Sequence, residues 1–408
     1  MPIFMGAKGE DVLSRRGTAD FLARLRQELY GRLAHLPPGE DLALLAGLEE
    51  KLREEIASEE RFSGEFSREL AELDEAGDSA SLTTLLQRLR AMAAEHFRRH
   101  GSVPAFHLLC TAAVDRAVAA AVRLTLRWME EIGPGAPSSP WCLMAIGEVG
   151  RGEASLFSLC DLLQIHGSDG AEEAPIFAGF AGRISALCEE IGLASRTGIG
   201  PSLPAWRGSM ADWRSRITAR CTEGGEDMEG VVRMADLRLV AGNPSLAAAA
   251  VNLVRAMLDY HREPLREAAR RTAMMPSGFD FFGRLRVERG GAHRGEFNLG
   301  LYGIEPLVAL VRVLTVRFDV SETGTVERIR GLLQGGRIDV ELAERLLFAW
   351  HALGGLAVAE EIGRGERAGG LFVSPGTLSE HALEELKRSL EAVGTLQKMV
   401  YSSVSGQW

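Results

Sequence analysis

The chain has 408 residues, of which 46% are hydrophobic and 25% are charged, a composition that excludes fibrous and disordered proteins. Lys and Arg number 46, and Asp and Glu number 56. The resulting net charge of −10 argues against a broad surface that binds nucleic acid. The five cysteines are far apart and form no Cys-x-x-Cys pair, which argues against a disulfide framework and a thiolate zinc site.

No segment predicts export or membrane insertion. Residues 1–16 are rich in charged residues and have no apolar signal-peptide core. The most apolar stretches are 112–126 and 306–316; charged residues interrupt both, and neither reaches the ~20 apolar residues that a spanning helix needs. We therefore expect a cytoplasmic protein in a reducing compartment, without membrane contact.

The first third of the chain predicts a bundle of helices. Leucines recur at helical spacing in residues 17–36, again after the Pro-Pro-Gly break at 37–39, and from Leu82 to Leu89. Residues 112–128 predict a more apolar helix that is buried on most sides. This region carries no binding motif.

A Pro- and Gly-rich break at residues 133–140 precedes a change of pattern. Three short apolar runs predict strands, at 141–146, 161–165 and 231–240. Helical periodicity recurs between and after them, at 176–191, 204–221, 245–273, 304–318, 325–334, 340–353 and 378–400. Residues 354–370 are Gly-rich and charged and predict a loose connection.

These elements predict an α+β fold. We expect an N-terminal helical bundle over residues 1–132, a small mixed-sheet domain over 141–275, and a helical C-terminal domain over 276–408. The residues that follow the first strand, 147–153, should form a turn, because the apolar run ends at a glycine.

The most informative segment is residues 145–161, AIGEVGRGEASLFSLCD. It resembles the first motif of the nucleotidyltransferase superfamily, which reads Gly-Ser-x-Gly-Arg-x-Glu, five variable positions and Asp-x-Asp. The matching positions are Gly147, Gly150, Arg151, Glu153 and Asp161.

The resemblance extends along much of the chain. Residues 204–214 resemble a helix with paired tryptophans, residues 236–242 resemble an Asp-Phe-Arg-x-Val-x-Gly strand, and residues 290–295 resemble a Gly-Gly-x-His-x-Gly turn. The order and spacing hold from residue 112 to residue 401. The chain thus resembles the nucleotidyltransferase family that is related to the N-terminal domain of protein-PII uridylyltransferase and carries a helical C-terminal domain.

The resemblance implies transfer of a nucleoside monophosphate from a nucleoside triphosphate to a protein or small acceptor, in signalling. Two Mg²⁺ ions would clamp the reacting oxygens, and Mg²⁺ prefers carboxylate ligands. Asp161 and Asp236 are the implied catalytic and metal-holding residues. The residues implied to face the nucleotide are Gly147, Glu148, Gly150, Arg151, Glu153 and Arg207. The implied partners are the triphosphate and an acceptor or regulatory protein, and no nucleic acid.

Two positions depart from the family pattern. Leu159 replaces the first aspartate of the Asp-x-Asp pair and cannot ligate a metal. Glu148 replaces the phosphate-binding serine, and at ~4 Å its charge would repel a phosphate charge by about 4 kcal/mol at an effective dielectric near 20. Two hypotheses therefore stand: a transferase whose activity is weak or lost, and a silent relative that binds a partner protein or senses a nucleotide.

The candidate residues also have structural interpretations. Asp236 could pair with Arg238 at strand spacing, and Arg151 could pair with Glu153. Trp206 and Trp213 are seven residues apart, which is more typical of a packed helix face than of base stacking. Arg207 and Arg214 have the same spacing and could reach phosphates or lie in solvent. His293, in its Gly-rich turn, is more typical of a structural than of a catalytic residue, and the other eight histidines are scattered and predict no metal site. A wholly helical scaffold would require the predicted strands to be absent.

Overall fold

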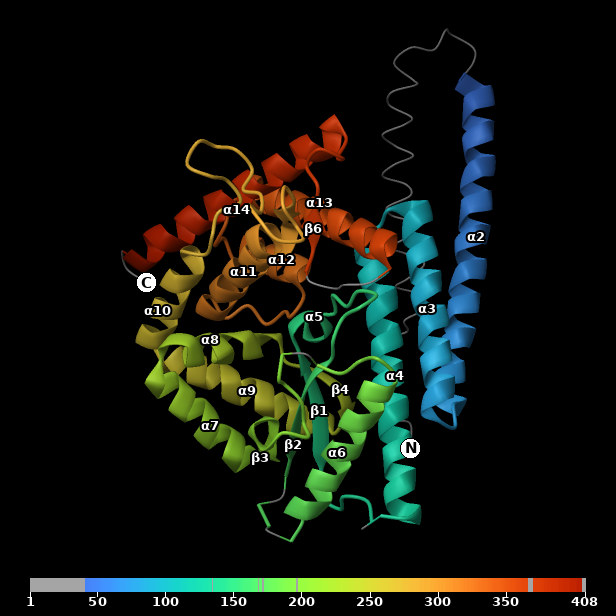
Figure 1. Cartoon of the computed structure of the whole chain (residues 1–408), viewed down its shortest axis with the longest axis vertical. Helices are drawn as coiled ribbons and strands as arrows, with labels where there is room; N and C mark the ends of the chain where they lie inside the picture. Colours follow the sequence, from blue (N-terminus) through green and yellow to red (C-terminus); the bar gives the residue numbers. More distant parts are fainter. Residues whose placement is uncertain are drawn as a thin grey trace.

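The computed structural model describes residues 41–405, apart from residues 134, 168, 171, 196 and 366–369. A small four-stranded sheet lies at the centre, with helices on both faces and a helical C-terminal part beside it (Figure 1). This arrangement confirms the predicted α+β class. The leucine pattern predicted before residue 37 lies outside the described residues.

Within the described residues, three helices precede the sheet: α2 (Asp41–Glu75), α3 (Ser79–His100) and α4 (Val103–Glu131). Their ends follow from local chemistry. Asp78 caps α3 by accepting a hydrogen bond from the backbone of Ser81 at 2.8 Å, and Gly101 ends it in the left-handed conformation. The prediction of a helical N-terminal part is confirmed over the described residues.

The sheet has the order β3-β2-β1-β4. Its strands are β1 (Trp141–Ile146), β2 (Asp161–His166), β3 (Arg207–Ser209) and β4 (Arg238–Gly242). β1 pairs antiparallel with both of its neighbours, and β2 pairs parallel with β3. The sheet is therefore mixed, as predicted.

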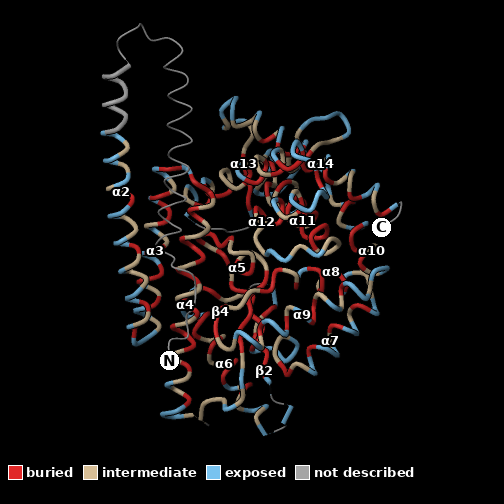
Figure 2. The backbone as a smooth tube through the Cα atoms, turned by 180° about the vertical axis from the view of Figure 1, so that it is seen from behind, coloured by how far each residue is buried: buried red, intermediate tan, exposed pale blue. Residues whose placement is uncertain are grey.

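The sheet separates two hydrophobic cores, because successive side chains of a strand point to opposite faces. Leu143 and Ala145 of β1 pack with α4 and α6 (Ala174–Glu190) in the first core, whereas Met144 and Ile146 belong to the second core. Figure 2 shows buried residues concentrated in the sheet and in the helices that cover it.

In the part of the chain that the structure describes, two helices, α4 and α13 (Val340–Arg364), are long and apolar enough to cross a membrane by length and composition. Fifteen residues of α4 are buried, from Val103 to Met129, and many of them form the first core. Burial inside a core accounts for the apolar character of α4 without a membrane.

Three predicted elements differ from the structure. Residues 231–240 are not one strand: helix α8 (Gly225–Arg233) and a 3₁₀ turn precede β4, because Met228, Val231 and Val232 bury one helical face. Residues 204–221 are not one helix either. They form a 3₁₀ turn, then β3, and then α7 (Met210–Glu223), whose first turn is capped by Ser209 and Asp212.

The third difference concerns the Gly-rich segment after residue 353. It continues α13 as far as Arg364 instead of forming a loose connection. A Cβ at Gly354 would lie 2.9 Å from Cγ1 of Val103. The glycine therefore lets α13 lie close against α4.

The helix predicted over 245–273 is divided at His261 into α9 (Pro244–Tyr260) and α10 (Arg262–Ala273). The remaining predicted helices are present with small changes at their ends, as α11 (Glu305–Arg317), α12 (Thr325–Gln334) and α14 (Glu380–Ser405). A two-stranded ribbon, β5 (Phe297–Asn298) and β6 (Phe372–Val373), was not predicted. Met144 and Ile146 of β1 pack with residues of α9–α14 in the second core.

Candidate functional site

The first sequence motif forms the turn that follows β1, as predicted. Gly147 has a φ of +69°, which turns the chain out of the strand, and α5 (Gly147–Gly150) is a single helical turn. A Cβ at Gly150 would lie 2.3 Å from the backbone oxygen of Asp236 and 2.8 Å from that of Ala145. Gly150 therefore serves close backbone packing, and it does not line the cleft described next.

A cleft of about 680 Å³ opens at this turn, between the sheet and the helices α8, α10 and α11. Gly147, Glu148 and Arg151 line one wall together with Leu159 and Asp161. Later segments add further polar residues to the lining, namely Glu229, Arg233, Arg271, Thr272, Glu305 and Arg312. The cleft thus brings the first motif to the C-terminal helices.

Asp161 is the first residue of β2 and faces the cleft. Its Oδ1 accepts hydrogen bonds from the hydroxyls of Ser195 at 2.5 Å and Thr197 at 2.8 Å. Burial raises the pKa of Asp161 above its ordinary value, although the two hydroxyls oppose that effect. Asp161 therefore lines the cleft although it is only 6% exposed.

Glu148 lies on the same wall, and its charge adds to the rise in the pKa of Asp161. The hydroxyl of Ser158 donates a hydrogen bond to Glu148 Oε2 at 2.6 Å. Leu159 is half-buried and also lines the cleft. Positions 159 and 161 thus face the same space, as the family's Asp-x-Asp pair would, but only one of them carries a carboxylate.

Asp236 has a different environment from the one the resemblance implied. It is completely buried in the 3₁₀ turn before β4, and its two oxygens accept hydrogen bonds from three arginines. Arg312 donates to both oxygens at 2.9 and 2.7 Å, Arg328 donates at 2.7 Å and Arg151 at 3.0 Å. Its predicted ion-pair partner, Arg238, instead pairs with Asp115 at 2.7 Å.

The carboxyl group of Asp236 is stabilised in its ionised form. Burial by itself would raise the pKa of Asp236, but Arg312, Arg151 and Arg328 together lower it well below the ordinary value. Arg312 and Arg151 line the cleft, whereas Asp236 lies behind them. Both oxygens of the carboxylate therefore accept hydrogen bonds from arginines.

Arg151 and Glu153 do pair with each other, at 2.6 Å. Glu153 is buried, and its second oxygen accepts a hydrogen bond from the backbone of Thr325 at 2.6 Å. This contact places a carboxylate at the N-terminus of α12, where the helix dipole favours negative charge. Glu153 thus joins the motif turn to the C-terminal helices and does not line the cleft.

Two further predictions concern the neighbourhood of β3. Arg207 donates hydrogen bonds to the carbonyls of Pro201 and Ser202 and is not part of the cleft lining. Trp213 is buried, and its indole donates to the carbonyl of Gln164 at 3.1 Å. The packing interpretation of Trp213 is therefore confirmed.

Arg233 is a cleft residue that the sequence did not reveal. It ends α8, is exposed, lines the cleft and acts electrostatically on Asp161. No ion-pair partner of Arg233 is seen among the described residues, whereas Arg271 is paired with Glu229 at 2.6 Å. Because residues 231–240 were predicted to form one strand, the position of Arg233 at the end of a helix was not predicted.

The carboxylates of this site do not fit a two-metal centre. Leu159 has no ligand atom, and Asp236 is saturated by arginines. Within the described part of the chain, ligand atoms of three or more His, Cys, Asp or Glu residues lie within 4.8 Å of one another in one group, and that group contains neither Asp161 nor Asp236. The implied metal geometry is not formed here.

Comparison with known protein families gives two matches. Residues 87–227 match the family described as Putative nucleotidyltransferase DUF294, and residues 262–404 match the Putative nucleotidyltransferase substrate binding domain. The two matches together span more than half of the chain, on both sides of the cleft. No curated protein matches the chain.

Proposed function

Since this chain belongs to the putative nucleotidyltransferase family DUF294, we propose that its cleft binds a nucleoside triphosphate but transfers the nucleotide weakly or not at all. The saturation of Asp236 by three arginines carries this proposal. Metal-assisted transfer needs several carboxylates that converge on the ions. Of the three positions where the family pattern has a metal-binding carboxylate, namely 159, 161 and 236, only 161 both carries a carboxylate and lines the cleft.

Arg233 is the group that we expect to meet the phosphates. It lines the cleft without an ion-pair partner among the described residues, so its charge is available for a ligand. Arg151 and Arg312 add positive charge to the lining of the same cleft, partly offset by Asp236 behind them. A charge-assisted contact between an arginine and a phosphate favours binding by about 1–3 kcal/mol.

The C-terminal helices contribute part of the cleft lining. Glu305 and Arg312 of α11 line the cleft, and the matching family model is described as substrate binding. A second ligand or an acceptor protein would therefore reach the nucleotide from this side. This geometry suits a module that senses a nucleotide and reports it through α11 and α12.

Titration calorimetry with each of the four nucleoside triphosphates, with and without Mg²⁺, tests the binding. We expect one triphosphate to bind, and Arg233→Gln to weaken it about 5- to 10-fold, equivalent to about 1–1.4 kcal/mol. Arg214→Gln is the matched control, because Arg214 is exposed on α7 and does not line the cleft. Absence of binding, or equal affinity in the Arg233 variant, would refute the assignment of the cleft.

The second part of the proposal concerns turnover. Each labelled triphosphate is incubated with Mg²⁺ or Mn²⁺ and candidate acceptors, including a PII-type protein. We expect no transfer above the level of the Asp161→Asn variant. The alternative, an active transferase, has one observation in its favour: Glu148 and Asp161 line the same wall. Robust transfer that Asp161→Asn abolishes would establish that alternative and leave the binding proposal standing.

A further inference from the structure

A cluster of histidine and glutamate side chains joins α2 to α3, on helices that contribute nothing to the lining of the nucleotide cleft. Glu55 and Glu59 are one turn apart on α2, and His96 and His100 are one turn apart on α3. Residues four apart lie on the same face of a helix, so the two pairs meet across the helix contact. The scattered histidines predicted no metal site, and this grouping differs from that expectation; the signal that could have indicated it is the His-x-x-x-His spacing of His96 and His100 within a predicted helix.

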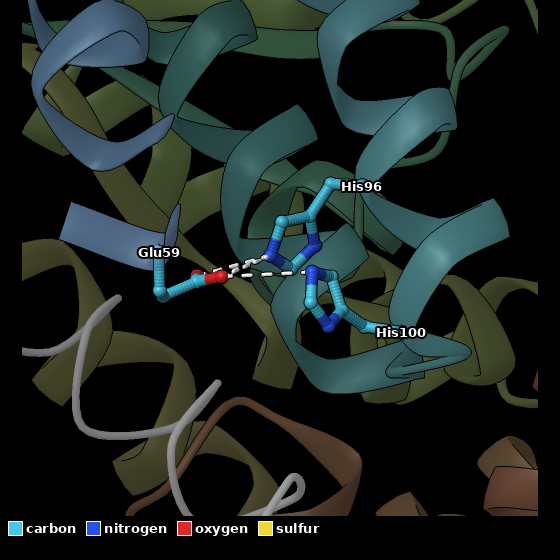
Figure 3. A group of neighbouring side chains, drawn as sticks. All are labelled: Glu59, His96 and His100. Atoms are coloured by element: carbon cyan, nitrogen blue, oxygen red, sulfur yellow. Dashed lines mark hydrogen bonds and ion pairs between the residues drawn. The ribbon is translucent and has the colours of Figure 1, made fainter. Parts of the chain in front are cut away.

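Three ligand atoms of this cluster converge (Figure 3). His96 Nε2 lies 3.0 and 3.2 Å from the two oxygens of Glu59, and His100 Nε2 lies 3.6 Å from Glu59 Oε2. Ligand atoms of a tetrahedral zinc ion, each about 2.0–2.2 Å from the metal, are roughly 3.3 Å apart. The separations from Glu59 are close to that spacing, and all three ligand atoms lie within 4.8 Å of one another.

A chain of polar contacts through Glu55 and Arg99 orients His100 for metal binding. Its other ring nitrogen, Nδ1, lies 3.2 Å from Glu55 Oε1. Arg99 donates to the second oxygen of Glu55 at 3.0 Å and so fixes that carboxylate. A proton on Nδ1 then leaves the lone pair of Nε2 directed toward Glu59, the arrangement in which a carboxylate supports a metal-bound histidine.

Burial protects the group from water. Glu59 is 8% exposed and His96 is 4% exposed, and the rings of His96 and His100 lie 4.4 Å apart. Nδ1 of His96 is buried without a hydrogen-bond partner among the described residues, so Glu59 is the polar group that holds this ring. Two imidazoles and one carboxylate thus face one another with little competition from solvent.

We propose that Glu59, His96 and His100 bind a divalent zinc-class transition-metal ion that joins α2 to α3. Two imidazole nitrogens and one carboxylate oxygen suit Zn²⁺ and exclude the oxygen-seeking Mg²⁺ and Ca²⁺ as preferred ions. Three protein ligands leave a fourth position for water. Binding of the ion replaces the Glu59–His96 hydrogen bond and stabilises the contact of the two helices.

The competing explanation is a metal-free hydrogen-bonded cluster. In that case Glu59 and the histidines share protons, and added metal finds no ordered site. Tag-free protein stripped with a chelator and dialysed at about pH 7.5, where ordinary histidines are neutral, separates the two cases. Zn²⁺ and Co²⁺ are added in calorimetric titrations, and bound metal is counted by mass spectrometry.

We expect one equivalent of Zn²⁺ to bind with a Kd of about 1 µM or below. Co²⁺ in the same site should show the visible absorption of a four-coordinate ion. Zn²⁺ should also raise the melting temperature of the wild-type protein and slow hydrogen exchange at residues 55–59 and 96–100. The exchange measurement needs no variant, so it tests the site even if a substitution prevents folding.

The variants Glu59→Gln, His96→Gln and His100→Gln should each weaken Zn²⁺ binding by about 100-fold or more, because each removes a ligand. Glu55→Gln should weaken it about 10- to 100-fold, as expected for a residue that orients a ligand. His381→Gln is the matched control, since His381 is 86% exposed and lies beside a single carboxylate, Glu385.

Two results would overturn the proposal. One is a wild-type protein that binds no stoichiometric Zn²⁺ and shows no exchange protection at these helices. The other is tight binding that the His96 and His100 variants leave unchanged, which would locate the metal elsewhere. The nucleotide experiments on Arg233 are independent of either result.

Discussion

Asp236 binds arginines from three segments at a position that water does not reach. Its partners lie on the motif turn, on α11 and on α12, so the residue fixes the sheet to the C-terminal helices. Removing one member of a buried charge cluster leaves the others uncompensated, at a cost of about 3–5 kcal/mol. We expect Asp236→Asn to lower the free energy of unfolding by this amount in urea denaturation. Asp259→Asn, which removes an exposed ion pair, should leave stability unchanged.

The same residue predicts a dependence of stability on pH. The pKa of Asp236 is lowered in the folded protein, so its stabilisation is fully present above its unfolded pKa, near 4, and is lost as the pH falls toward the folded value. Between about pH 5 and pH 2, the free energy of unfolding should therefore fall more steeply in the wild type than in Asp236→Asn. Parallel curves for the two proteins would contradict the assignment.

Leu159 and Glu148 determine what the cleft can hold. Leu159 is half-buried and faces the cleft, so Leu159→Asp should cost at most about 1 kcal/mol, as for a polar group that keeps water contact. Leu163→Asp is the control: Leu163 is 1% exposed, and an unpaired charge there should prevent stable folding. Thermal melts of the two variants compare these costs.

The double variant Leu159→Asp/Glu148→Ser restores the paired carboxylates and removes a charge that repels phosphate. We expect it to bind Mg²⁺-nucleotide more tightly than the wild type in calorimetry. The single variant Glu148→Ser should account for most of the gain in nucleotide affinity. No gain from either change would mean that the cleft does not accept the phosphates at this wall.

At the scale of elements, the turn after β1 depends on Gly150, which packs against the backbone of β1 and of the 3₁₀ turn before β4. Any side chain at position 150 would overlap the backbone oxygens of Asp236 and Ala145. Gly150→Ala should therefore lower the free energy of unfolding by about 3 kcal/mol, because neither backbone can move aside easily. In Gly179→Ala, on the exposed side of α6, the added methyl meets nothing within 4 Å, and stability should stay equal or rise by up to about 1 kcal/mol. Equal stability of the two variants would contradict the close packing.

At the scale of the whole molecule, the sheet couples two cores, because β1 contributes alternate side chains to each. Cys110, Cys160 and Cys188 belong to the core beside α4, whereas Cys142 and Cys221 belong to the other. All five thiols are buried. Burial raises the pKa of Cys142 and Cys188 to about 12 and that of Cys221 to about 11.

These thiols report whether the cores unfold together. We expect negligible alkylation of the native protein at about pH 8, because the thiols are both inaccessible and protonated. In increasing denaturant, all five should become reactive over the same range, since opening either core exposes β1. Pulse alkylation with mass spectrometry follows each cysteine separately. Earlier labelling of one core's cysteines would show that the two cores unfold independently.

The sequence by itself determined the elements whose signals are local. β1, the turn after it and α12 lie where they were predicted, since a strand or helix within one apolar pattern depends on neighbouring residues. The sequence pointed to Asp161 because its motif is contiguous with that turn, and this residue lines the cleft. The strand predicted over 231–240 failed, because a helix and a strand follow each other there without a Gly or Pro between them.

Only the tertiary structure decided the partners of the charged residues. Asp236 meets Arg312 and Arg328, which lie 76 and 92 positions further along the chain, and Glu59 meets His96 across a helix contact. Arg233 became a cleft residue through the packing of α8 beside α10. A carboxylate can hold a metal, an arginine or a proton, and which of these it holds depends on groups brought close by folding, which no local pattern encodes.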